Sequence, residues 1–160
     1  MWTQRVQERY PSINIQNING SLYVTYATVN SKGIGQPGGF VDEYNSSGTL
    51  MQRIATSGSL YAPWGLTLAP KILGRFGGDL LIGQFGSGEI LAYDLSNNNE
   101  FVGTLNGKDG KPITNPYLWA LEFRTAGPNI NTNALYFAAG YNNQEDGLFG
   151  FIGVPNAVGP

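Results

Sequence analysis

The sequence repeats a short series of apolar runs about three times, and this repetition restricts the fold more than any other feature. A run that begins at Leu22 returns at Leu80 and again at Leu135, so the period is about 55 residues. One apolar run precedes each of these and another follows each of them. A fourth run follows in the first two units, whereas the third unit stops before it reaches one. Strands are predicted at 13–16, 22–27, 39–44, 50–54, 64–68, 80–85, 88–93, 101–105, 119–123, 135–140 and 147–152.

Residues that favour tight turns separate these runs at corresponding places. Asn19-Gly20 divides the first two runs, and Ser46-Ser47-Gly48 divides the third and fourth. In the second unit the corresponding turns are predicted at 77–79 and 96–99. Asp94 is expected to end a strand and to begin its turn through a side-chain hydrogen bond to the backbone. The glycine-rich stretch 33–39 lacks the Lys and the following helix of a phosphate-binding loop, so it is predicted to be a flexible loop.

Four-stranded units at this period are typical of the blades of a β-propeller. Charged residues make up only 12% of the chain and there are 23 glycines, which fits an all-β fold with many turns. An open sandwich is the alternative, but it gives no reason for Trp64 and Trp119 to recur in step with the strands. We therefore predict a single all-β propeller segment over 1–160, with about three four-stranded blades at approximately 11–58, 62–107 and 117–153.

Three blades do not close a ring, because propellers usually have about four to eight. The sequence therefore predicts one of two arrangements. Either N-terminal blades are missing, or a homodimer completes a six-bladed ring, which would make the chain a homo-oligomer. The alternating segment 1–6 is a possible closing strand for the incomplete third unit.

Composition excludes several classes of function. The net charge is −2 without a basic patch, so neither a nucleic acid nor a membrane surface is an expected partner. The absence of His and Cys excludes histidine acid–base chemistry, thiol nucleophiles and metal sites built on those residues. No apolar run reaches the length of a membrane-spanning helix, and the first residues do not have the pattern of a signal peptide.

Several motifs in order resemble a known family. They include Ala62-Pro63-Trp64-Gly65-Leu66, the stretch 78–86, and Leu135-Tyr136-Phe137-Ala138-Ala139-Gly140 with 147–150. With 11–27 and 39–42, they resemble the C-terminal half of an uncharacterised bacterial six-bladed propeller family. That family is related in form to NHL-repeat proteins, and some members carry a PEP-CTERM sorting tail. The resemblance implies an extracellular or cell-surface location, and it brings no established activity.

The loops that enter the innermost strand of each blade form one rim of a propeller. Trp64 and Trp119 lie at two such entries, and Asn14 takes the corresponding place in the first unit. Two rim tryptophans can stack on a sugar ring or another flat small molecule, with Asn14 and Gln84 supplying hydrogen bonds. The structural alternative is that the tryptophans are wedges between blades, since residues repeated in register usually serve packing.

The remaining choice lies between a binding module and an enzyme. Hydrolases of the lactonase type hold Ca²⁺ in the channel of a six-bladed propeller with Glu, Asn and Asp. Candidate oxygen ligands here are Asp42, Glu43, Asp79, Asp94, Asp109, Glu145 and Asp146. The densest cluster, 142–147, lacks regular ligand spacing, so a solvated turn is the favoured interpretation of it. The polar residues of the predicted inner strands are Asn14, Gln16, Thr67 and Glu122, of which one is acidic. This favours a non-catalytic binding or scaffold module without a cofactor, and a Ca²⁺-dependent lactonase-type hydrolase is the alternative.

Overall fold

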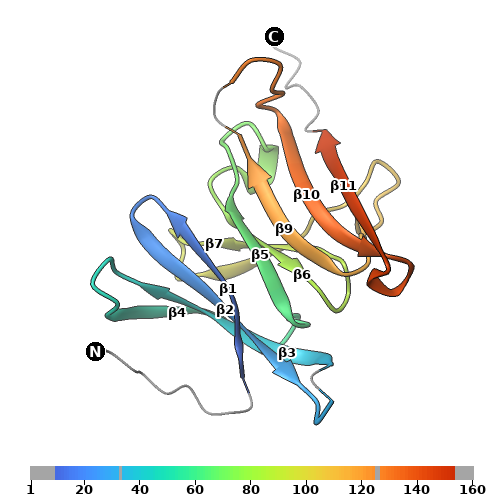
Figure 1. The fold of residues 1–160 in the computed structure, drawn as a ribbon. Coiled ribbons are helices and arrows are strands. Elements are labelled where there is room, and N and C mark those ends of the chain that lie inside the picture. The colour runs from blue at the N-terminus through green and yellow to red at the C-terminus, as the bar shows by residue number, and fades with distance from the viewer. Residues whose placement is uncertain (1–9, 33, 125–126, 154–160) are drawn as a thin grey trace.

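The computed structural model describes residues 10–32, 34–124 and 127–153, and these form an all-β fold of three antiparallel sheets (Figure 1). The first sheet contains β1 (Ser12–Ile18), β2 (Ser21–Val29), β3 (Gly35–Tyr44) and β4 (Leu50–Thr56). The second contains β5 (Pro63–Leu68), β6 (Leu80–Gln84), β7 (Ile90–Asp94) and β8 (Glu100–Thr104). The third contains β9 (Leu118–Phe123), β10 (Ala134–Tyr141) and β11 (Asp146–Gly153).

Each sheet is a meander, because its strands are hydrogen-bonded in the order in which they follow one another along the chain. Every predicted strand is present, and the arrangement of the sheets is propeller-like. The 3-10 helices η1 (Gly74–Phe76) and η2 (Asn142–Gln144) were not predicted. Within the described residues, no helix has the length and apolar character needed to cross a membrane. The predicted closing strand at 1–6 lies outside the described residues.

Two of the predicted tight turns, at Asn19-Gly20 and after Asp94, are present in the structure. Asn19 and Gly20 have φ values of 53° and 91°, and they connect β1 to β2 directly after the pair Ile18–Ser21. Positive φ at both turn residues is the type I′ geometry, whose twist matches that of a hairpin. At the end of β7, the Ser96 backbone N–H donates to Asp94 Oδ1 at 2.8 Å, which confirms the predicted turn. This bond and the one from the Ser96 hydroxyl lower the pKa of Asp94.

The glycine-rich stretch departs from its prediction. β3 begins at Gly35, so residues 35–39 belong to a strand and not to a flexible loop. Gly38 and Gly39 have φ values of 106° and 113°, and the register between β2 and β3 shifts beside them. Because glycine has no Cβ, positive φ is accessible there, and the run bends the strand without ending it.

The second sheet lies between the other two and is buried on both sides. One face of β6 and β7, including Leu80 and Ile82, packs on Tyr23 and Val41 of the first sheet. The opposite face packs on the third sheet; its core residues are Leu81, Ile90 and Ala92 against Leu118, Leu121, Leu135, Phe137 and Ala139. The innermost strands also approach closely, since a Cβ on Gly65 would lie 3.0 Å from the backbone nitrogen of Leu121.

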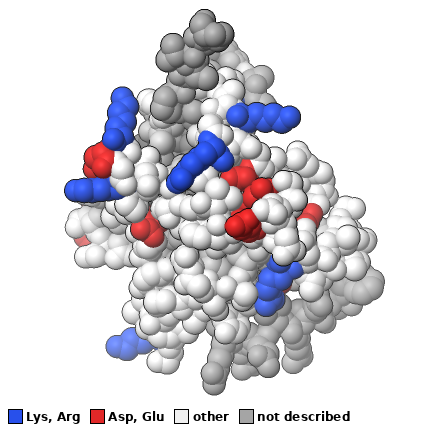
Figure 2. Space-filling view, turned by 180° about the vertical axis from the view of Figure 1, so that it is seen from behind, with Lys and Arg blue, Asp and Glu red and all other residues white. Residues whose placement is uncertain are grey.

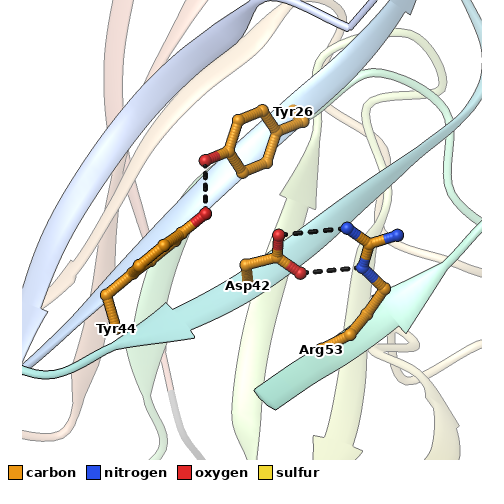
Figure 3. A network of polar contacts seen from close by, with 4 residues as sticks. All are labelled: Tyr26, Asp42, Tyr44 and Arg53. Carbon is orange, nitrogen blue, oxygen red and sulfur yellow. Dashed lines mark hydrogen bonds and ion pairs between the residues drawn. The ribbon is translucent and has the colours of Figure 1, made fainter. Parts of the chain in front are cut away.

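A polar network covers the face of the first sheet that points away from the second (Figure 3). Arg53 donates to both carboxylate oxygens of Asp42, at 2.8 and 3.1 Å, and its guanidinium carbon lies 3.9 Å from the ring centroid of Phe40. The bond to Asp42 raises the pKa of Arg53. The hydroxyls of Tyr26 and Tyr44 lie 2.9 Å apart. Burial, helped by this hydrogen bond, raises the pKa of Tyr26.

Gly39 fixes the approach of the first sheet to the second, and its replacement tests this contact. An added Cβ would meet the Tyr26 carbonyl oxygen and would lie 2.8 Å from Pro63 Cδ. We expect Gly39→Ala to lower the free energy of unfolding by about 1–3 kcal/mol, because overpacking and positive φ both oppose the side chain. Urea denaturation measures this loss. Gly147→Ala, which meets nothing within 4 Å, should be close to neutral. Equal losses in the two variants would contradict the prediction.

Candidate functional site

Four aromatic rings form a continuous row at the rim where the chain enters the inner strands. Trp119 lies 6.5 Å from Trp64, Trp64 lies 5.3 Å from Phe85, and Phe85 lies 5.3 Å from Tyr117, measured between ring centroids. Trp119 is 38% exposed, and the other three side chains are partly buried. We call these four residues the aromatic row. The row brings together the two tryptophans that the sequence analysis singled out.

A pocket of about 490 Å³ opens at the Phe85 and Tyr117 end of the aromatic row. Four connections meet there, those that follow β2, β4, β6 and β8, so residues far apart in the sequence share one surface. Its lining includes Ile34, Tyr61, Phe85, Thr114, Pro116 and Tyr117. Apolar and aromatic walls with few polar groups are typical of a small-molecule site. We call this the rim pocket.

Asn14 positions the rim and does not face the pocket. Its side-chain Nδ2 donates to the Trp64 carbonyl oxygen at 2.9 Å, and Thr25 Oγ1 donates to the same oxygen at 3.4 Å. These bonds join the first sheet to the start of β5. Asn14 therefore holds the backbone that carries Trp64, and is not among the residues that line the rim pocket.

Gln84 is also a positioning residue. Its side chain is fully buried. Its Oε1 accepts the Tyr61 backbone N–H at 2.7 Å, and its Nε2 donates to the Ile82 carbonyl oxygen at 3.1 Å. The amide is thus occupied at both ends by backbone groups, and it fixes Tyr61 at the wall of the rim pocket.

Replacing Gln84 tests this positioning role. Gln84→Leu leaves the Tyr61 N–H without its acceptor, and an unsatisfied buried donor costs about 1–3 kcal/mol. We expect the free energy of unfolding to fall by that amount in chemical denaturation. Gln144→Leu, at an exposed position, is the matched control and should change it little. A Gln84→Leu variant as stable as the parent would contradict the assignment.

Tyr61 and Tyr117 are rim residues that were not predicted from the sequence. Both lie in connections between sheets, where no strand periodicity indicates the direction of a side chain. Tyr117 has a φ of 54°, an uncommon conformation for an aromatic residue. Their position in the repeat could have indicated this role. Tyr61 and Tyr117 each lie just before the inner strand of a unit, a few residues ahead of Trp64 and Trp119.

Apart from Asn14, the polar residues predicted on the inner strands lie at the opposite end of these strands. Gln16, Thr67 and Glu122 line a cavity of about 570 Å³ that touches all three sheets. Glu122 forms an exposed ion pair with Arg124 at 3.6 Å. Within the ranges described above, no three acidic residues come together in a way that could hold a metal ion.

A third hollow, of about 800 Å³, lies at the junction of the first two sheets and is lined by several charged side chains. Its charged residues are Glu43, Lys71, Arg75, Asp79 and Asp94. The face in Figure 2 shows small mixed groups of basic and acidic side chains on a largely uncharged background. Asp79 is 6% exposed, and its Oδ2 has no hydrogen-bond partner. Burial, together with the nearby charge of Asp94, raises the pKa of Asp79.

This raised pKa predicts a specific dependence of stability on pH. A carboxyl whose pKa is higher in the folded than in the unfolded state favours folding when protonated, and its contribution is lost as pH rises through the folded value. Asp79→Asn should therefore increase the free energy of unfolding at pH 7. The gain should shrink as pH falls through the raised folded-state pKa. It should be gone below the ordinary Asp pKa of about 4, where the carboxyl is protonated in both states. Thermal denaturation across this range measures both. A gain that does not change with pH would contradict the explanation.

Comparison with known proteins gives relatives without an assigned role. No protein-family model matches the chain. Two uncharacterised proteins of Acanthamoeba polyphaga mimivirus are 33% and 30% identical to it, each over 148 residues and 89% of this chain. These relatives are viral, whereas the resemblance led us to expect bacterial ones, and they give no support to an NHL-repeat or PEP-CTERM assignment. The chain spans only 36% and 38% of their lengths.

Among solved structures, a catalytically inactive virginiamycin B lyase from Staphylococcus aureus, in a structure with quinupristin, aligns over 94% of this chain and 58% of its own. The TM-score is 0.41 and the sequence identity is 14%. The chain's own three meander sheets make it an all-β protein, and the relatives reported above are uncharacterised.

Proposed function

We propose that the chain is a non-catalytic β-propeller segment that acts as a binding module, with the rim pocket and the aromatic row as its binding surface. The observation that carries the proposal is the junction of these two features at Phe85 and Tyr117. A partly exposed aromatic face there can stack on a flat or saccharide ring, and the pocket can enclose the rest of a small ligand.

The chemistry of the surface supports a neutral ligand. The residues that line the rim pocket carry no formal charge, and hydrogen-bonding groups are supplied by side chains such as Tyr61, Ser87 and Thr114. Aromatic faces beside hydroxyl groups suit the alternating apolar and polar surfaces of a sugar. We therefore propose a small oligosaccharide as the ligand class. No observation in the described part of the chain favours the Ca²⁺-dependent hydrolase.

Titration with soluble di- and trisaccharides built on glucose, mannose or N-acetylglucosamine tests the proposal. Because Trp64 belongs to the aromatic row, we expect saturable changes in tryptophan fluorescence, with a dissociation constant in the millimolar range. Tyr117→Ala should weaken binding by about 2- to 10-fold, the loss expected for one aromatic contact. Tyr141→Ala removes a 60% exposed ring outside the pocket and is the control.

Nuclear magnetic resonance of the labelled protein gives a second readout that does not depend on tryptophan. We expect shifts at Phe85 and Tyr117 on addition of the sugar that binds. Absence of both signals for every sugar tested would overturn the ligand class. Binding that Tyr117→Ala and Tyr141→Ala affect equally would overturn the site.

A further inference from the structure

The outward face of the third sheet exposes large aromatic side chains. Phe149 and Phe151 of β11 are 76% and 63% exposed. Tyr136 of β10 lies 6.1 Å from each of them between ring centroids, and Ala138 is paired with Phe149 on the same face. An apolar surface of this kind on a sheet commonly marks an interaction site. We call these four residues the trailing face.

Because the sheets are repeats, the trailing face can be compared with the equivalent face of the second sheet. In the second sheet Leu81 is paired with Ala92, and Gly83 with Ile90. In the third sheet Tyr136 is paired with Phe151, and Ala138 with Phe149, in the same positions of the unit. Leu81, Ile90 and Ala92 are fully buried against the third sheet. The trailing face is therefore the equivalent of a surface that this chain already uses to pack one sheet on the next.

The first sheet carries the complementary surface on its outward side. In the second sheet, Leu66, Leu80 and Ile82 belong to the core shared with the first sheet and are at most 1% exposed. Their equivalents in the first sheet are Ile15, Leu22 and Val24, since Ile15 pairs with Val24 as Leu66 pairs with Ile82. Ile15 is 59% exposed, and Leu22 and Val24 are partly exposed. We call these three the leading face.

We propose that the trailing face of one copy packs on the leading face of a second copy, and that two such contacts close a ring of six sheets. Each chain carries one half of the interface at each end, so the second copy supplies the missing half without any further component. A contact between different surfaces of identical chains forms a closed ring when the rotation between copies closes, and three sheets per chain fit a twofold rotation.

The polar network beside the leading face gives this contact a specific feature. Asp42 occupies the position that Leu91 has in the second sheet, because Asp42 pairs with Val24 as Leu91 pairs with Ile82. Its partner Arg53 is 47% exposed and has one side of the guanidinium on Phe40. In the proposed contact, the exposed part of this side chain meets an aromatic ring of the trailing face, a favourable arrangement when water is excluded.

The mass of the chain in solution, measured by light scattering over a range of concentrations, tests the proposal. We expect a dimer near twice 17.3 kDa. Phe149→Asp should raise the dimer dissociation constant at least tenfold, as loss of a central aromatic contact does. Ile72→Asp alters a 45% exposed apolar residue outside both faces and should leave the dimer intact.

Cysteine cross-linking tests the geometry directly, because the chain has no cysteine of its own. Within one chain, a Cβ on Gly83 would lie 3.1 Å from Leu121 Cδ1. The equivalent positions across the proposed contact are Ala138 and Ile15. The double variant Ala138→Cys with Ile15→Cys should form a covalent dimer on oxidation, and neither single variant should do so.

Three results would overturn the proposal. The first is a monomer at every concentration with no cross-link in the double variant, which would show that a second copy of this chain does not cover these faces. The second is a dimer that Phe149→Asp and Ile72→Asp weaken equally. The third is an open series of larger species, which would show that the contact does not close. None of these results bears on sugar binding at the rim pocket, so the two proposals are tested separately.

Discussion

Burial of both faces of the second sheet is the constraint on which the rest of the structure depends. All five residues of β6 are buried; Leu80 and Ile82 belong to one core, and Leu81 between them belongs to the other. A strand without a solvent-facing side needs a neighbouring sheet on each side. The first and third sheets supply these neighbours, and this stacking brings β1, β5 and β9 together at the centre (Figure 1). The aromatic row follows from that approach, since its residues come from different sheets.

Asn14 and Gln84 bind backbone groups and hold the rim in position, and they do not offer hydrogen bonds to a ligand. Asn14 binds the backbone beside Trp64, and Gln84 binds the backbone of Tyr61. Each satisfies a main-chain group that the close approach of the sheets would otherwise leave without a partner. The binding surface thus consists of aromatic side chains presented by a backbone whose position other residues determine.

The strands and tight turns were predictable, and the site was predictable only in part. Apolar periodicity and Asn-Gly or Asx turns are local signals, so β1 to β11 followed from the sequence. The roles of Asn14 and Gln84 depend on partners 50 and 23 residues away, which no local pattern indicates. The prediction of a loop from Gly35 to Gly39 was wrong, because glycines that bend a strand cannot be distinguished by sequence from glycines that form a loop. Tyr117 was missed because irregular connections have no periodicity.

The consecutive pairing of strands also bears on how the chain reaches this structure. Each strand within a sheet pairs with its neighbour in the sequence, so every hairpin closes a loop that is short compared with the whole chain. Little chain entropy is lost in closing such hairpins. The slower requirement is the docking of finished hairpins, since the two cores join residues from separate repeats. Strand pairing is therefore set within each repeat, whereas burial of the second sheet depends on docking between repeats.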